Sequence, residues 1–113
     1  MFEPRDQSVA GKVFTYGGLG DFWIGIHDRY NEGTFVYESD DALLSSTNWG
    51  AGEPNDNTSG EDCVEVKIEW NGKWNDIPCT ETKSYVCTRD TGKGISIFIF
   101  LTSRFIMIVC LFA

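Results

Sequence analysis

The chain has 113 residues, which is enough for one small domain. Its formal net charge is −8, and the excess is concentrated in residues 21–87, which contain fourteen acidic and four basic side chains. So acidic a segment excludes phosphate-mediated binding of nucleic acid, which requires clustered Lys and Arg. Because like charges repel one another unless cations are bound or the charges stay solvated, metal binding is the leading explanation for the excess.

The first twenty residues show no sustained periodicity, and only residues 13–16 resemble a strand. The signals sharpen at residues 22–26, a short apolar run preceded by Gly and Asp, which predicts a buried strand. Residues 34–37 predict a second strand. The segment 38–60 that follows is rich in Ser, Asp, Asn, Gly and Pro, and a long loop of this kind is usually functional.

Residues 63–70 alternate between apolar and polar side chains, as in a strand with two different faces. The apolar set is Val64, Val66, Ile68 and Trp70, and the polar set is Glu65, Lys67 and Glu69. Asn71-Gly72 is the favoured pair for a two-residue hairpin turn, so we expect residues 73–77 to return as the partner strand. With a third strand over 84–88, the pattern predicts a small antiparallel sheet from which the acidic loop projects.

The tail, residues 95–113, differs in character, because fifteen of its nineteen residues are apolar. It follows a linker over 89–94 and has the length of a membrane span. Arg104 at its centre opposes insertion by about 2.5–3.5 kcal/mol, which the many Ile, Leu, Phe and Val side chains can offset. The alternative is translated intron beyond Gly92-Lys93, and the sequence leaves both interpretations open.

The four cysteines indicate an extracellular domain. They are Cys63, Cys79, Cys87 and Cys110. Three lie within 25 residues in a polar, turn-rich stretch typical of secreted domains, and the lack of a Cys-x-x-Cys pair argues against a structural zinc site. Residues 1–12 are polar, so no signal peptide is visible. We expect a secreted or extracellular chain that is incomplete, with membrane anchoring as the alternative location.

The acidic loop carries four carboxylates within ten residues that contain no basic side chain. These are Glu53, Asp56, Glu61 and Asp62. Together with Asn55 and Asn57 they form an all-oxygen donor set, which suits calcium with its 6–8 ligands at about 2.3–2.6 Å. Magnesium fits less well because it keeps several waters, and the spacing is not that of an EF-hand. A solvated loop without metal is the alternative.

Five short motifs follow one another between residues 21 and 88. They are Trp23-Ile24-Gly25-Ile26, Glu53-Pro54-Asn55, Gly60-Glu61-Asp62-Cys63, Gly72-Lys73-Trp74-Asn75-Asp76 and Tyr85-Val86-Cys87. In this order they resemble the motifs of C-type lectin domains. Their order, spacing and two matching cysteines make the resemblance specific. It implies an α+β, C-type lectin-like fold, here mainly its C-terminal half of antiparallel strands with a long calcium-binding loop.

The resemblance implies one calcium site that also binds sugar, formed by Glu53, Asn55, Glu61, Asn75 and Asp76. In the family the proline of the Glu-Pro-Asn loop is cis, which would direct the oxygens of Glu53 and Asn55 toward the same ion. Two positions on the ion would take vicinal sugar hydroxyls, which also exchange hydrogen bonds with Glu53, Asn55, Glu61 and Asn75. This motif implies mannose, N-acetylglucosamine or glucose, whose 3- and 4-hydroxyls are equatorial.

A second calcium site is implied by four further carboxylates. These are Asp28, Glu32, Asp56 and Asp62, which occupy the places of the second site in mannose-binding-type members.

Several conspicuous side chains have structural interpretations. We expect Trp23, Trp49 and Trp74 to be core residues and not platforms for sugar stacking, because Trp is usually well buried. We expect Trp70 to close the hairpin face and His27 to be a loop or core residue and not a ligand.

The resemblance also implies a disulfide between Cys63 and Cys79 that ties the base of the loop. The family's first strand and two helices are not recognisable in residues 1–20, so Cys87 lacks its usual partner. Cys110 is the remaining cysteine, but a disulfide into the apolar tail would be unusual. We therefore expect an N-terminally truncated domain with a small core. The sequon at 57–59 would place a glycan against the calcium loop, so we expect low occupancy.

No arrangement of residues supports catalysis, and we predict that the chain is not an enzyme. The leading prediction is a calcium-dependent module that binds glycans or glycoproteins. The alternatives are a lectin-like domain that binds protein or ice, a truncated chain without binding activity, and a glycosidase-like carboxylate pair. The glycosidase is the weakest of these because the acids cluster on one loop. The sequence leaves the oligomeric state undetermined.

Overall fold

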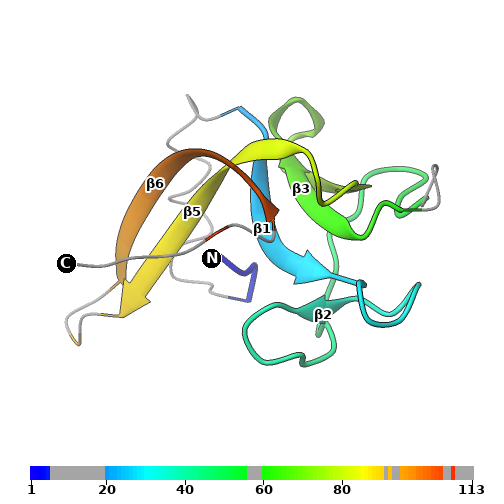
Figure 1. Cartoon of the computed structure of the whole chain (residues 1–113), viewed down its shortest axis with the longest axis horizontal. Helices are drawn as coiled ribbons and strands as arrows, with labels where there is room; N and C mark the ends of the chain where they lie inside the picture. The colour runs from blue at the N-terminus through cyan, green and yellow to red at the C-terminus, as the bar shows by residue number, and fades with distance from the viewer. Residues whose placement is uncertain (6–19, 56–59, 91, 93–94, 106–107, 109–113) are drawn as a thin grey trace.

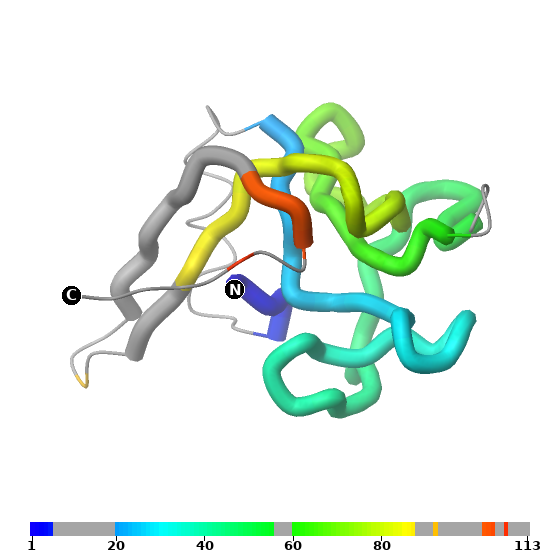
Figure 2. The backbone as a smooth tube through the Cα atoms, viewed as in Figure 1, coloured from blue at the N-terminus to red at the C-terminus, as the bar shows by residue number. Residues whose placement is uncertain are grey.

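A computed structural model describes residues 1–5, 20–55, 60–90, 92, 95–105 and 108. Its elements are β1 (Phe22–His27), β2 (Val36–Tyr37), β3 (Cys63–Lys67), the 3-10 turn η1 (Ile68–Trp70), β4 (Lys73–Ile77), β5 (Thr82–Asp90) and β6 (Ile95–Arg104). The strands form one sheet in the order β4-β3-β1-β5-β6, and β2 pairs with β1 (Figure 1). The backbone path shows that the long loops gather on the β3 side of the sheet, away from the β5–β6 arm (Figure 2).

Most of the predicted strands are present, but the turn after β3 differs from the prediction. Lys67 pairs with Lys73, so the connection spans five residues and is not a two-residue hairpin turn. Asn71 and Gly72 do adopt positive φ angles of 56° and 84°. The alternation stops early because the Ile68 N–H donates to the Asp21 carboxylate at 3.0 Å instead of to β4, which starts the 3-10 turn.

The sequence pattern predicted an antiparallel sheet, but the observed sheet is mixed. β1 and β5 are parallel, with Phe22 opposite Ser84 and Trp23 opposite Tyr85. Phe2 lies between these two strands: its N–H donates to Val86 O at 2.6 Å, and its carbonyl accepts from Gly25 N–H at 2.7 Å. The two strands are far apart in sequence, so a parallel pairing could not be read from local turn signals.

Alternating side chains of the central strands build one apolar cluster on each face of the sheet. The first cluster contains the buried side chains of Phe2, Phe22, Ile24, Ile26, Tyr37, Val64, Val66, Trp74 and Val86. The second contains Trp23, Cys63, Ile77 and Phe105. β1 is buried along its whole length because both of its faces are covered. The predicted core roles of Trp23 and Trp74 are confirmed, with exposed fractions of 0% and 5%.

The predicted disulfide between Cys63 and Cys79 is present. The sequence left the partner of Cys87 open, and in the structure Cys87 is also disulfide-bonded. Cys110 lies outside the described residues, as do residues 13–16, Asp56 and the sequon.

Strand β6 is formed by the first part of the apolar tail. It pairs antiparallel with β5 from Asp90–Ile95 to Thr82–Arg104, and its Ser103 carbonyl accepts a hydrogen bond from the Trp23 indole at 2.8 Å. Among the described residues, none of the helical segments is long and apolar enough to cross a membrane.

Candidate functional site

The long loop over residues 38–60 is hydrogen-bonded to the edge strand β4 just before the acidic part of the loop. Trp74 N–H donates to Asn48 O, and Gly50 N–H donates to Trp74 O, each at 2.9 Å. The ring of Trp49 packs edge-on against those of Trp74 and Phe35, with centroid distances of 5.4 and 4.8 Å. Trp49 is therefore a packing residue that anchors the loop, as predicted.

The Glu53–Pro54 peptide bond is cis. After this bend, the Asn55 N–H donates to Asp76 Oδ1 of β4 at 3.1 Å, and the Asn55 side-chain amide donates to Glu53 Oε2 at 3.2 Å. The cis bend thus brings the side chains of Glu53 and Asn55 together beside Asp76, which is 1% exposed.

The electrostatics around Glu53 indicate that three carboxylates converge here. Burial raises the pKa of Glu53, and the neighbouring carboxyl groups of Asp76 and Glu61 raise it further. Its Oε1 atom is buried and accepts no hydrogen bond from the described residues. Carboxylates this close repel one another unless a cation lies among them or a proton is bound.

Asn75, the fifth predicted ligand, is held from the interior of the sheet. Its Nδ2 donates to Glu65 Oε2 at 2.9 Å, and Glu65 lies directly opposite Asn75 in the β3–β4 register. Glu65 Oε1 is in turn 3.0 Å from Lys83 Nζ. Sequence reasoning assigned no role to Glu65 or Lys83, because the predicted two-residue turn at 71–72 would place Asn75 opposite Ile68 and not opposite Glu65.

A second acidic cluster lies at the end of β1. Carboxylate oxygens of Asp28, Glu32 and Asp62 all lie within 4.8 Å of one another. Asp28 is 2% exposed; its Oδ2 accepts from Gly33 N–H at 2.9 Å, and its N–H donates to Asp62 O at 3.0 Å. The Oδ1 atoms of Asp28 and Asp62 are buried and accept no hydrogen bond from the described part of the chain. Asp56, the fourth predicted ligand, is not among the described residues.

The pKa of Asp28 is raised to about 7. Burial is the largest cause, and the carboxyl groups of Glu32 and Asp62 add to it, while the Gly33 hydrogen bond acts in the opposite direction. The carboxylate is therefore poorly stabilised by the protein alone and would be stabilised by a cation.

His27 and Trp70 do not contribute to either cluster. His27 is 1% exposed, accepts the Arg29 N–H at Nδ1, and has its ring edge-on to Tyr30 and Phe105. This agrees with the expectation of a core histidine. Trp70 is 37% exposed and lies near Lys67 Nζ, 5.4 Å from the ring centroid.

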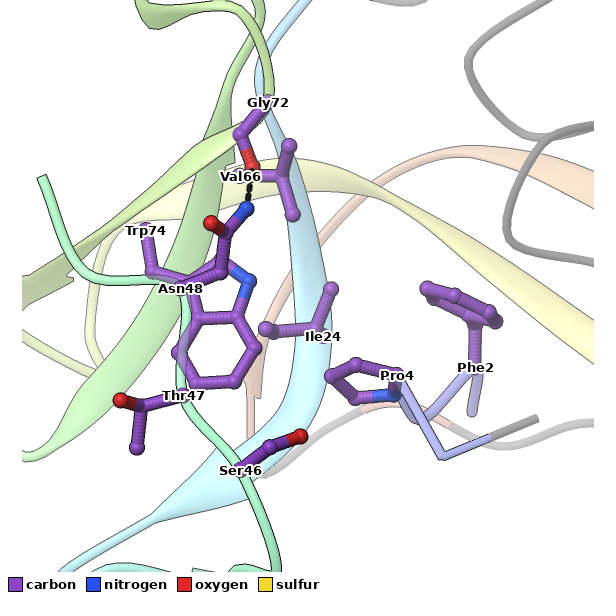
Figure 3. Close-up of a pocket in the computed structure, with 9 residues that line it drawn as sticks. All are labelled: Phe2, Pro4, Ile24, Ser46, Thr47, Asn48, Val66, Gly72 and Trp74. Carbon is purple, nitrogen blue, oxygen red and sulfur yellow. Dashed lines mark hydrogen bonds between the residues drawn. The ribbon is translucent and has the colours of Figure 1, made fainter. Parts of the chain in front are cut away.

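A separate pocket of about 190 Å³ opens on the first face of the sheet (Figure 3). It is lined by Phe2, Pro4, Ile24, Ser46, Thr47, Asn48, Val66, Gly72 and Trp74. Asn48 spans one side by donating to Gly72 O at 3.1 Å. None of these described lining residues is acidic, so the pocket is distinct from both carboxylate clusters.

The donor sets of both clusters fit calcium. They consist of carboxylate and amide oxygens, and each includes buried carboxylate oxygens whose hydrogen-bonding capacity the described residues leave unused. The cis loop, Asn75 and Asp76 would hold one ion, and Asp28, Glu32 and Asp62 would hold another.

Comparison with known proteins agrees with this geometry. The family described as Lectin C-type domain matches residues 12–89. The chain belongs to the C-type lectin domain family. The members of this family are known as non-enzymatic carbohydrate-binding proteins, so the predictions of the C-type lectin-like fold and of a chain that is not an enzyme are confirmed.

Two curated C-type lectins illustrate the relationship. Collectin-10 of Xenopus tropicalis is 40% identical over 87 residues, covering 74% of this chain and 31% of the relative. An alpha-N-acetylgalactosamine-specific lectin of Patiria pectinifera is 39% identical over 82 residues, covering 71% of this chain and 46% of the relative. The chain thus spans between about a third and a half of the length of these relatives.

Among solved structures, the carbohydrate-recognition domain of cow CD23, determined in the presence of a GlcNAc2Man3 oligosaccharide, aligns with a TM-score of 0.51. It is 36% identical, and the alignment covers 68% of this chain and 55% of that chain.

Proposed function

We propose that this C-type lectin domain binds sugars in a calcium-dependent manner through Glu53, Asn55, Glu61, Asn75 and Asp76. The observation that carries the proposal is the position of Asn55, whose N–H donates to Asp76 Oδ1 and whose side-chain amide donates to Glu53 Oε2, so that the three side chains lie together. Calcium, when bound, offers coordination positions to two vicinal hydroxyls. The carboxylates of Glu53 and Glu61 would accept hydrogen bonds from those hydroxyls, and the amides of Asn55 and Asn75 would donate to them.

The proposed sugar class is mannose, N-acetylglucosamine and glucose. The Glu-Pro-Asn sequence supports it, and so does the oligosaccharide present with the cow CD23 domain. The N-acetylgalactosamine specificity of the Patiria relative supplies the competing sugar class for the test. Glycoproteins outside the cell are the partners that follow, whether the chain is secreted or attached to a membrane.

A second calcium ion at Asp28, Glu32 and Asp62 is part of the proposal. The three carboxylates share one small volume, and two of their oxygens are buried without a hydrogen bond from the described residues. Asp62 follows Glu61 directly, so a cation here would also steady the sugar site.

Affinity chromatography tests the proposal. The folded chain should be retained on mannose-agarose in calcium, be released by a chelator, and bind N-acetylgalactosamine-agarose more weakly. Glu53→Gln should lower retention at least tenfold, because it removes one anionic oxygen from the ion. Glu81→Gln, an exposed acid outside both clusters, is the matched control and should be retained like the native chain.

Retention that persists in the presence of the chelator would refute calcium dependence. Stronger retention on N-acetylgalactosamine than on mannose would refute the sugar class while leaving the calcium mechanism in place. A folded chain that binds neither resin but binds a protein ligand or ice would favour the alternative of a lectin-like domain without sugar binding.

A further inference from the structure

Glu65 is a buried acid in the centre of the sheet. It lies on β3 with Trp23 of β1 on one side and Asn75 of β4 on the other, and it is 2% exposed. Burying a carboxylate costs several kcal/mol unless it is paired and hydrogen-bonded. An apolar side chain would fill a purely structural position in this sheet more favourably. The buried carboxylate of Glu65 therefore indicates a role beyond packing.

Both oxygens of Glu65 are engaged, by groups that can only donate. Oε1 forms an ion pair with Lys83 Nζ at 3.0 Å, without hydrogen-bond alignment, and Oε2 accepts from Asn75 Nδ2 at 2.9 Å. An ionised carboxylate has no hydrogen to donate, and an ammonium group has no acceptor. The hydrogen bond between Asn75 and Glu65 therefore has a fixed polarity, from amide to carboxylate, while Lys83 holds the other oxygen by charge.

This polarity fixes the orientation of the Asn75 amide. A flip of the amide would place Oδ1 against the Glu65 carboxylate, where two acceptors would face each other. In the observed orientation Oδ1 is turned away from Glu65. Because β4 is the edge strand and β3 its inner neighbour, the side of the amide opposite Glu65 faces away from β3, toward the edge of the sheet. One hydrogen on Nδ2 remains to donate to another group.

We propose that Glu65, held by Lys83, is a positioning residue that presents the Asn75 oxygen to calcium and one Asn75 N–H to the sugar. The inference rests on the proposed function of the site. Glu65 and Lys83 would then belong to the site although they contact neither the ion nor the sugar. It also explains why a costly buried charge lies directly opposite Asn75.

The variant Glu65→Gln reverses the polarity at nearly constant volume. Lys83 can only donate, so it selects Oε1 of the new amide and leaves Nε2 to face Asn75. Asn75 then turns its oxygen inward and its NH2 group outward, toward the ion. Calcium affinity, measured by titration calorimetry on the full chain, should fall about 10–100-fold, the range typical when a group orienting a metal ligand is removed. The control Glu69→Gln, on an acid with a 71% exposed side chain, should leave it unchanged.

The double variant Glu65→Gln/Asn75→Asp separates positioning from packing. It conserves net charge, and the amide at position 65 can donate to the new carboxylate, whose second oxygen remains available to calcium. Calcium affinity should recover most of the loss of about 10–100-fold that Glu65→Gln alone causes. Sugar affinity should not recover, because position 75 no longer carries an N–H donor.

A measurement on the native chain does not depend on the variants folding. In the metal-free protein, one Asn75 Nδ2 proton should give an NMR signal shifted downfield of its position in an exposed Asn side chain, because it bonds to Glu65. Both Nδ2 protons at the positions of an exposed Asn would show that this bond is absent and would overturn the inference.

The outcomes distinguish the two proposals. Native chain that binds no calcium defeats the proposed function, and this inference with it. Native calcium binding with unchanged affinity in a folded Glu65→Gln defeats the inference alone, as does a loss that the double variant fails to restore.

Discussion

Asp28 and Glu53 carry carboxyl groups whose pKa is raised by burial and by neighbouring acids. In each case an oxygen of the same group is buried without a hydrogen bond from the described residues. Such groups lower the stability of the metal-free protein when they ionise, and they favour binding of a cation in the ionised form. The same residues thus couple pH, calcium and stability.

The stability of the metal-free chain should fall as the pH rises toward neutrality. The pKa of Asp28 in the folded chain, about 7, lies above its ordinary value of 3.8, so its contribution is complete below about pH 4 and is lost as the pH rises to about 7. The full difference corresponds to about 4 kcal/mol, and solvent screening reduces the expected loss to about 2 kcal/mol in the free energy of unfolding. Urea denaturation of calcium-free protein between pH 4 and 7.5 measures it.

The variant Asp28→Asn provides the comparison. It has no titrating group at this position, so its metal-free stability should change less over the same pH range, and calcium should stabilise it less at pH 7.5. Calcium should stabilise the native chain most at neutral pH, because protons compete for the same oxygens. Identical pH profiles for the two proteins would contradict the role assigned to Asp28.

At the scale of elements, β1 carries the contacts that join the first residues of the chain to the sheet. Glu3 is 4% exposed, and its carboxylate accepts from the Ser39 N–H and hydroxyl at 3.0 and 3.1 Å and from Arg5 Nε at 3.0 Å. A Cβ at Gly25 would lie 2.8 Å from Glu3 Cγ and 3.3 Å from Phe2 O. Gly25 therefore allows residues 2–4 to lie close against β1.

Gly25→Ala should lower the free energy of unfolding by about 1–3 kcal/mol, the usual effect of overpacking a close contact. Gly50→Ala is the matched control, because a Cβ there would lie 2.7 Å from the ring of Trp70. Trp70 is 37% exposed and can move, whereas Glu3 is held by three hydrogen bonds. Urea denaturation should show the larger loss for Gly25→Ala. Equal losses would show that Glu3 is not rigidly held.

For the molecule as a whole, one sheet has to support two apolar clusters and a loop-rich site. Cys63 begins β3, belongs to the second cluster and directly follows Glu61 and Asp62. Its bond to Cys79 closes the segment that contains β3 and β4. The disulfide therefore links the acidic residues before Cys63 to the end of the edge strand.

Replacing both Cys63 and Cys79 with Ala should lower the free energy of unfolding by about 3 kcal/mol, because the closed loop spans 16 residues. Calcium affinity should also fall, since Asp62 loses its anchored neighbour. Glu69→Gln, inside the same loop but exposed, should change neither quantity. Retention of calcium affinity in a folded disulfide-free variant would show that the loop is ordered without this bond.

Local patterns were sufficient for several features. The apolar run at 22–26 predicted β1, and the alternation of Val64 and Val66 predicted β3. The cis bond before Pro54 and the Cys63–Cys79 disulfide followed from the resemblance and are present. The ligand residues and the sugar class stay predictions that the binding experiments test.

Other features depended on contacts between distant segments. The turn after β3 was predicted too short because Ile68 bonds to Asp21, 47 residues away. The alternation set Glu65 on a polar face, but β1 on one side and β4 on the other leave it buried. The bonded state of Cys87 was likewise left open by the sequence, because the family's usual partner is not recognisable in residues 1–20.

The sequence by itself determined the family, the order of β1 to β5 along the chain and the oxygen-rich chemistry of residues 53–62, because these depend on residue types at short spacing. Only the tertiary structure decided the parallel pairing of β1 with β5, the convergence of Glu53 with Asp76, and the contact of Lys83 with Glu65. These depend on which distant segments become neighbours when both faces of one sheet are buried, and no local pattern encodes that choice.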